Sequence, residues 1–152
     1  SSEVVRFRLT SPLAQTPLNS EQATQLRALV SNEGEDVRRT AIEILARRLS
    51  NSPNERAETV ALFMETTAND PSAQVRETGA MSLRAASTIP GAAETLVRAA
   101  TSDTDPEVRA AAAASLASFM SDPAARDTLV DVRDNDPSEL VRASARRALG
   151  AR

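Results

Sequence analysis

The chain has 152 residues, a formal net charge of −3 and 41% apolar residues, which argues against a disordered protein and indicates one domain of ordinary size. It has no Cys and no His, and all 18 basic residues are Arg. Disulfides and thiolate metal sites are therefore excluded. The slightly negative net charge gives the chain no overall attraction to nucleic acid or anionic lipid. No apolar run approaches the roughly 18 residues that a membrane-spanning helix needs.

Residues 1–18 differ in pattern from the rest of the chain. The segment VVRFRL alternates apolar and basic residues, which is typical of a β-strand. Two prolines then interrupt the backbone before the first helix. We predict an extended N-terminal arm or linker over residues 1–18, followed by a helical domain over residues 19–152.

Four segments of the helical domain carry apolar residues at the i, i+3, i+4, i+7 spacing of an amphipathic helix. Each contains Ala, Leu, Val or Met on one face and polar residues elsewhere. We predict these helices at residues 20–31, 53–68, 91–101 and 123–133.

A second helix follows each of the four, and its sequence recurs. A Val-Arg dipeptide is followed by a small residue four positions after the Val and by Leu eight positions after it, which forms one apolar stripe on a helix. The small residue allows another helix to approach closely. The four valines are Val37, Val75, Val108 and Val141.

The repeated helices also carry start signals. Asp followed by Pro precedes three of the four Val-Arg dipeptides, and Asp is a frequent N-cap while Pro fits the first helical turn. Gly34 supplies the turn in the first copy. We therefore predict that three of these helices begin at Asp70-Pro71, Asp105-Pro106 and Asp136-Pro137.

The chain thus predicts eight helices in four hairpins. A single hairpin is too small to bury its own apolar face, so neighbouring hairpins must stack. The approximate repeats are residues 19–50, 51–88, 89–121 and 122–152.

The four units resemble HEAT repeats, in particular the short bacterial HEAT-like kind, over roughly residues 19–150. The motif of that family places an Asp six residues before an Arg on the inner helix of each hairpin. The first unit keeps the spacing but has Asn in place of Asp. The matching pairs are Asn32/Arg38, Asp70/Arg76, Asp103/Arg109 and Asp136/Arg142.

This resemblance implies an all-α fold, namely a right-handed α-solenoid of four HEAT-like hairpins. It also implies that the Asp and Arg side chains form a ladder between adjacent repeats. Their expected duty is therefore structural, and the resemblance implies neither a catalytic role for them nor a cofactor.

The residue types in the sequence give little support for catalysis or metal binding. General acid–base chemistry near neutral pH usually uses His, or a perturbed Cys, Lys or carboxylate, and three of these four residue types are absent. Acidic clusters at residues 103–107 and 131–136 offer oxygen ligands but lack the EF-hand pattern. Acidic residues at a helix N-terminus are explained by capping and the helix dipole. We expect no enzyme, no metal and no cofactor.

A protein partner is the interpretation that the repeats favour. Stacked hairpins expose their inner helices as a concave surface, with small and apolar residues at its centre and charges at both ends. Such a surface suits an extended or helical peptide, although the alanines also serve simply to support the helix. The predicted contact residues are Arg39, Glu43, Glu77, Met81, Ala111, Ala114, Ser144 and Arg147.

Nucleic acid is the alternative partner, because arginines cluster on the first inner helix and on the last. Acidic residues interleave with the first cluster, and no Lys accompanies either. A chromophore-attaching phycobilin lyase is a further HEAT-like alternative, but such a groove needs aromatic residues and the chain has only three, all Phe. The missing Cys and the first residue, Ser1, are compatible with an extracytoplasmic fragment of a larger protein.

Overall fold

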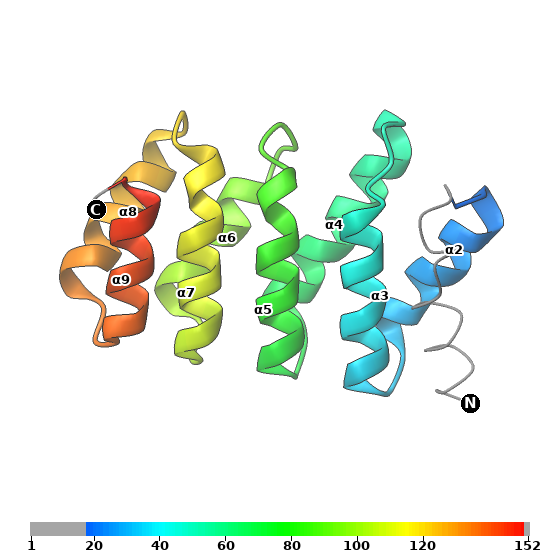
Figure 1. Cartoon of the computed structure of the whole chain (residues 1–152), viewed down its shortest axis with the longest axis horizontal. Helices are drawn as coiled ribbons and strands as arrows, with labels where there is room; N and C mark the ends of the chain where they lie inside the picture. Colours follow the sequence, from blue (N-terminus) through cyan, green and yellow to red (C-terminus); the bar gives the residue numbers. More distant parts are fainter. Residues whose placement is uncertain (1–17, 151–152) are drawn as a thin grey trace.

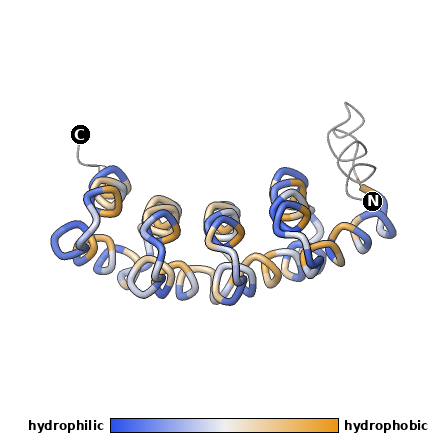
Figure 2. Tube along the Cα trace, turned by 90° about the horizontal axis from the view of Figure 1, so that it is seen from below, coloured by the Kyte–Doolittle hydropathy of each residue, from blue (hydrophilic) through white to orange (hydrophobic). Residues whose placement is uncertain are grey.

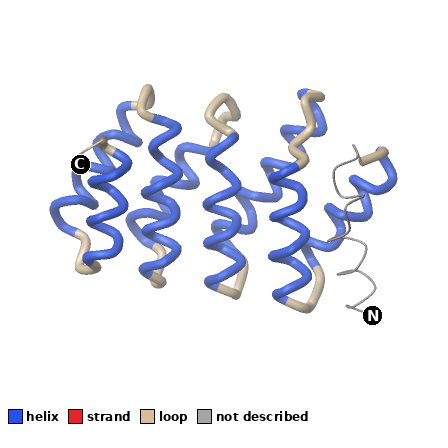
Figure 3. The backbone as a smooth tube through the Cα atoms, viewed as in Figure 1, coloured by secondary structure: helices blue, strands red, loops and turns tan. Residues whose placement is uncertain are grey.

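The structure is a computed structural model that describes residues 18–150. Within this range the chain forms α-helices and short 3-10 extensions with no strand, which confirms the predicted all-α fold (Figure 1, Figure 3). The predicted arm, including its VVRFRL segment, lies outside the described residues except for Leu18.

The eight described helices pair into four successive hairpins. The first helices of the pairs are α2 (Ser20–Ala28), α4 (Pro53–Asn69), α6 (Ala92–Ser102) and α8 (Pro123–Asn135). The second helices are α3 (Glu35–Arg47), α5 (Ala73–Ser82), α7 (Pro106–Ser115) and α9 (Glu139–Ala148). The 3-10 turns η2 (Leu29–Ser31), η3 (Leu83–Ala85) and η4 (Leu116–Phe119) extend α2, α5 and α7.

The hairpins stack in one curved row. Helices α3, α5, α7 and α9 lie side by side, each packed on the next, while α4, α6 and α8 form a parallel outer row (Figure 1). Viewed along the inner helices, the outer row follows the convex side of the arc and the inner row stands on its concave side (Figure 2). The inner helices therefore supply the concave surface.

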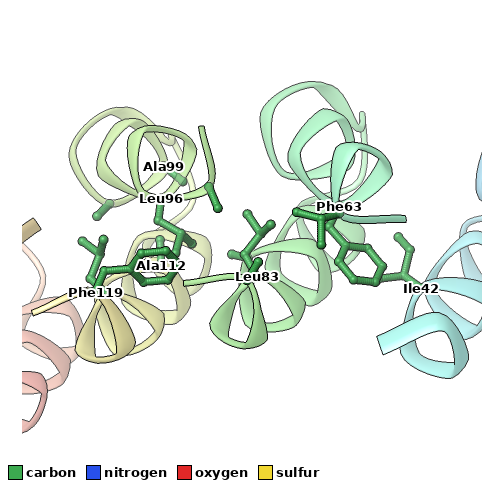
Figure 4. Packing of buried hydrophobic residues seen from close by; sticks show 14 of the residues in the cluster. Ile42, Phe63, Leu83, Leu96, Ala99, Ala112 and Phe119 are labelled. Carbon is green, nitrogen blue, oxygen red and sulfur yellow. The ribbon is translucent and has the colours of Figure 1, made fainter. Parts of the chain in front are cut away.

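The core lies between the two rows. The repeated Val, small residue and Leu stripe faces it, and in the two middle repeats all members of the stripe are fully or almost fully buried. Side chains of the outer helices pack into this core: Phe63 of α4 points toward Ile42 of α3, the residue after the small residue of the first stripe (Figure 4). The apolar core runs through all four hairpins, so each hairpin completes its burial against its neighbours.

Helices α4 and α5 approach each other closely at Gly79, the small residue of the second stripe. A Cβ atom added to Gly79 would lie 2.7 Å from Oγ1 of Thr67 and 3.1 Å from the backbone nitrogen of Thr67. The first distance is shorter than real Cβ contacts and the second is tighter than most of them, so the absence of a side chain permits this close approach.

Helix α7 begins where the sequence predicts. Asp105 is its N-cap, with Oδ1 accepting the backbone N–H of Glu107 at 2.8 Å, and Pro106 occupies the first turn. An N-cap acceptor followed by Pro is a favourable helix start, because it satisfies a free N–H and places the missing donor where none is needed.

Helices α5 and α9 begin two residues later than predicted, and the prediction is wrong there. Their N-caps are Ser72 and Ser138, while Asp70 and Asp136 lie in the preceding loop and accept the N–H groups of those serines at 2.9 and 2.8 Å. Asp103 does the same for the N–H of Asp105. The loop position six residues before the Arg is thus equivalent in all three repeats.

Candidate interaction surface

Three arginines of the inner helices bridge to an aspartate of the following hairpin. Each uses Nε and Nη2 to donate two parallel hydrogen bonds to one carboxylate, at 2.8–3.1 Å. The paired side chains are only 7–14% exposed. The bridges are Arg38–Asp70, Arg76–Asp103 and Arg109–Asp136.

The Asp and Arg of one motif are also linked, but through the backbone. Nη1 of Arg76 donates to the carbonyl oxygen of Asp70 at 3.0 Å, and Arg109 contacts the carbonyl of Asp103 at 2.9 Å in the same way. Each arginine therefore fixes the loop of its own hairpin and the loop of the next one. Such two-sided arginine contacts resist sliding of one hairpin over the other.

The ladder carboxylates are held in the charged form. Burial alone would raise the pKa of Asp70, Asp103 and Asp136, but the arginine hydrogen bond, a backbone N–H and the flanking arginine charges outweigh it. Their pKa values therefore lie below the ordinary value for Asp. The positive charges that stabilise them come from two different hairpins.

The two ends of the ladder differ from its middle. Asn32 keeps the loop geometry, because its Oδ1 accepts the N–H of Gly34 at 3.0 Å, but no arginine within residues 18–150 reaches its side chain. Asn32 is exposed, so its side chain does not need a counter-charge at this end of the ladder. At the other end, Arg142 pairs with Glu139 of its own helix, and Glu139 also pairs with Arg146.

The residues predicted to contact a partner lie on the inner helices but differ in exposure. Met81 is 51% exposed, and Arg147 is also exposed. Five are half-buried: Arg39, Glu43, Glu77, Ala111 and Ala114. Ser144 is 9% exposed, so its side chain is mostly covered, and its contact with a partner stays a prediction.

Sequence reasoning missed a further row of the same face. The residue before each repeated Val is exposed, and it shares a helical stripe with the positions three and six after that Val. The spacing i, i+4, i+7 could have identified it. The missed residues are Asp36, Gln74, Glu107 and Leu140.

Comparison with protein families bears on this arrangement. The profile described as HEAT repeats matches residues 60–150, more than half of the chain. The chain belongs to the HEAT-repeat family. HEAT repeats generally mediate protein–protein interaction, and their stacked hairpins provide extended concave surfaces for it. No match to the chain is found among curated proteins.

Charges on the first inner helix of these HEAT repeats neutralise one another. Arg39 pairs with Asp36 at 3.3 Å and Arg47 with Glu43 at 3.5 Å, both within α3. Glu77 of α5 is surrounded mainly by negative charge. Burial raises the pKa of Glu77, the charges of Glu107 and Asp105 raise it further, and the charge of Arg39 lowers it. A cationic group of a partner would relieve this local excess of negative charge.

The acidic clusters of the HEAT repeats have local partners. Asp103 and Asp136 belong to the ladder, Asp105 caps α7, and Asp134 pairs with Arg133. Among residues 18–150, no group of three or more His, Cys, Asp and Glu side chains could hold a metal ion. None of the helices described has the length and apolar character that a membrane crossing requires.

Proposed function

We propose that this HEAT-repeat chain is a non-enzymatic interaction module whose concave face binds a peptide or a helix of a protein partner. The observation that carries the proposal is Met81, a large apolar side chain of the inner helix α5 that is 51% exposed. Ala111 and Ala114 of the adjacent helix α7 are half-buried.

The chemistry of these side chains suits a partner of variable shape. Methionine is unbranched and polarizable, so it adapts to different apolar groups. Alanine leaves room for the side chains of the partner to approach the helix backbone. On the concave side, the hydropathy is polar at α3 and α9 and more apolar at α5 and α7 (Figure 2). An apolar stretch of a peptide would cross the middle, and its polar flanks would reach the charged ends.

Nucleic acid is the less supported partner, because most arginines of the inner helices already have acidic partners. The ladder engages three of them, and the two on the concave side of α3, Arg39 and Arg47, pair with carboxylates of their own helix. A phosphate backbone would also run past Glu77 and Glu107. Affinity for generic DNA that falls steeply with salt would favour this alternative.

Site-specific photo-crosslinking tests the proposal. A benzoylphenylalanine placed at Met81 on α5 reports on the concave face, and the same residue placed at Val130 on α8 is the matched control, since Val130 is 39% exposed on the outer row. Both variants should keep the helical circular dichroism of the parent protein. We expect crosslinks to a discrete polypeptide from position 81 and none from position 130.

Two results would contradict the proposal. Equal crosslinking from both positions would mean that the concave face has no preference for a partner. Crosslinks to nucleic acid in place of polypeptide would favour nucleic acid as the partner. A second pair of variants, Met81→Glu and Ala111→Glu, should abolish the polypeptide crosslinks made from a probe at position 77 without lowering helicity.

A further inference from the structure

The C-terminal ends of α7 and α9, together with η3, frame a hollow of about 400 Å³ on the inner row. We call it the arginine hollow. Arg84 and Arg147 line it together with two serines, Ser118 and Ser144, and its remaining lining is three alanines: Ala114, Ala117 and Ala148. Its size is within the range of small-ligand pockets, about 300–1,000 Å³.

The two arginines of the hollow have no acidic partner in the described part of the chain. The side chain of Arg84 makes no ion pair or hydrogen bond within residues 18–150, and that of Arg147 makes one 3.3 Å hydrogen bond to the carbonyl of Ala143 in its own helix. Among the described residues, no Asp or Glu lines the hollow. Most other arginines of the inner helices are paired. The hollow therefore concentrates positive charge that the fold does not neutralise.

The repeat pattern does not require arginine at either position. Arg147 is six residues after its Val, where the other repeats have Glu43, Met81 and Ala114. Arg84 is nine residues after its Val, where the other repeats have Ala46, Ala117 and Gly150. The two arginines thus come from different repeat positions of α9 and the α5 extension, yet they line one hollow on opposite sides of α7.

Interaction with helix dipoles is the simpler explanation for an arginine near a helix C-terminus. It accounts for Arg147 in the last turn of α9 and for Arg84 in the 3-10 turn that ends α5. It does not account for the absence of Asp and Glu from the lining of the hollow within residues 18–150, nor for two arginines of different hairpins that share one hollow with three alanines. Both features are expected of a site that accepts an anionic group from outside.

We infer that the arginine hollow binds the carboxylate of an acidic residue in the peptide that occupies the concave face. This inference rests on the proposed function and specifies the partner: an apolar segment with Asp or Glu toward the C-terminal hairpins. Guanidinium groups pair with carboxylates through two parallel hydrogen bonds, and the alanines accept the methylenes of the acidic side chain. Glu77 and Glu107, on the same face, disfavour a longer polyanion.

Nuclear magnetic resonance titration of the whole chain tests the inference with two defined probes. One is an N-acetylated octapeptide of alanine and leucine with two central glutamates, and the other is its twin with two glutamines. The glutamate peptide should shift the amide signals of Ser118, Ser144 and Arg147. It should bind about fivefold more tightly than the glutamine twin, which is the advantage that partly exposed ion pairs provide.

Charge-removing variants locate the effect. The double variant Arg84→Gln/Arg147→Gln should abolish the preference for the glutamate peptide. The matched control Arg133→Gln lies on α8, where Arg133 pairs with the adjacent Asp134, and should leave the preference unchanged. Both substitutions affect exposed or half-exposed side chains, so the helical fold is expected to persist and circular dichroism verifies this.

The outcomes separate this inference from the proposed function. Equal binding of both peptides across Met81 and Ala111 would overturn the acidic-residue inference and leave the concave-face function standing. No shift with either peptide at 5 mM (on the order of the weakest affinities usually measured) would also overturn the inference, while crosslinking at Met81 decides the function separately. A third probe, octathymidylate, tests for a general polyanion site. If it shifts the same amide signals at least as strongly as the glutamate peptide, the hollow binds polyanions in general and the acidic-residue inference is overturned.

Discussion

Arg76 of α5 and Asp103 of the following hairpin are joined by two parallel hydrogen bonds of 2.8 and 3.0 Å. Asp103 and Arg109 belong to the same motif, yet the carboxylate of Asp103 accepts its hydrogen bonds from Arg76 of the preceding repeat. Arg109 donates instead to the backbone carbonyl of Asp103. The motif therefore connects three consecutive hairpins through two arginines. Together with the shared apolar core, this arrangement couples the folding of neighbouring hairpins.

Asp103→Asn should destabilise the protein strongly, because it leaves the mostly buried guanidinium of Arg76 without a counter-charge. We expect the free energy of unfolding in urea to fall by about 3 kcal/mol, as for other broken buried pairs. The matched control is Arg98→Gln, which removes an ion pair with Glu94 between side chains that are 76% and 67% exposed, and it should cost less than about 1 kcal/mol. Equal losses in the two variants would contradict a structural role for the ladder.

Stability should decline in acid because of the ladder carboxylates. Their pKa values are lower in the folded protein than in the unfolded chain, so the stabilisation is complete above the unfolded value, about 3.9, and is lost as the pH falls through the folded values. Thermal unfolding followed from pH 7 to pH 2 should show a steep decline below about pH 4. The decline should be shallower in Asp103→Asn, and parallel curves for the two proteins would refute this explanation.

Gly79→Ala should destabilise the protein even though alanine favours helices by about 1 kcal/mol. The new Cβ would meet the backbone nitrogen of Thr67 at 3.1 Å, so α4 and α5 must separate. Overpacking of this kind costs about 1–3 kcal/mol, and we expect a net loss of about 1 kcal/mol in urea unfolding. Gly34→Ala is the steric control, since its Cβ would have ordinary contacts at 3.5 Å. Its expected loss, about 0.5 kcal/mol, comes only from the N-cap position of Gly34, and a loss larger than that of Gly79→Ala would contradict the steric argument.

Ser115→Ala should preserve or increase stability. The Oγ atom of Ser115 is buried in α7 and has no hydrogen-bond partner among residues 18–150, and an unsatisfied buried hydroxyl costs about 1 kcal/mol or more. Ser82 occupies the same repeat position in α5, and its hydroxyl donates to the carbonyl of Thr78 at 2.7 Å. Ser82→Ala should therefore gain nothing. A clear loss of stability in Ser115→Ala, measured by urea unfolding, would show that its hydroxyl is satisfied in solution.

The alternation of amphipathic helices and the period of the Val-Arg motif were readable from the chain itself. Helical periodicity and helix-starting residues are local properties, so they place each helix to within a few residues. The shifted starts of α5 and α9 were missed because Asp-Pro resembles a helix start. In the structure, Asp70 and Asp136 instead accept a backbone N–H of their own loop and pair with an arginine of the preceding hairpin.

What the sequence by itself determined is the set of helices, their pairing into hairpins and the apolar stripe that each must bury, because these depend on residues within one or two turns of one another. The tertiary structure alone decided that Asp103 serves Arg76, that Ser144 is covered, and that Arg84 and Arg147 line one hollow across α7. These relations depend on the distance and rotation between neighbouring hairpins, which arise only when the hairpins pack together.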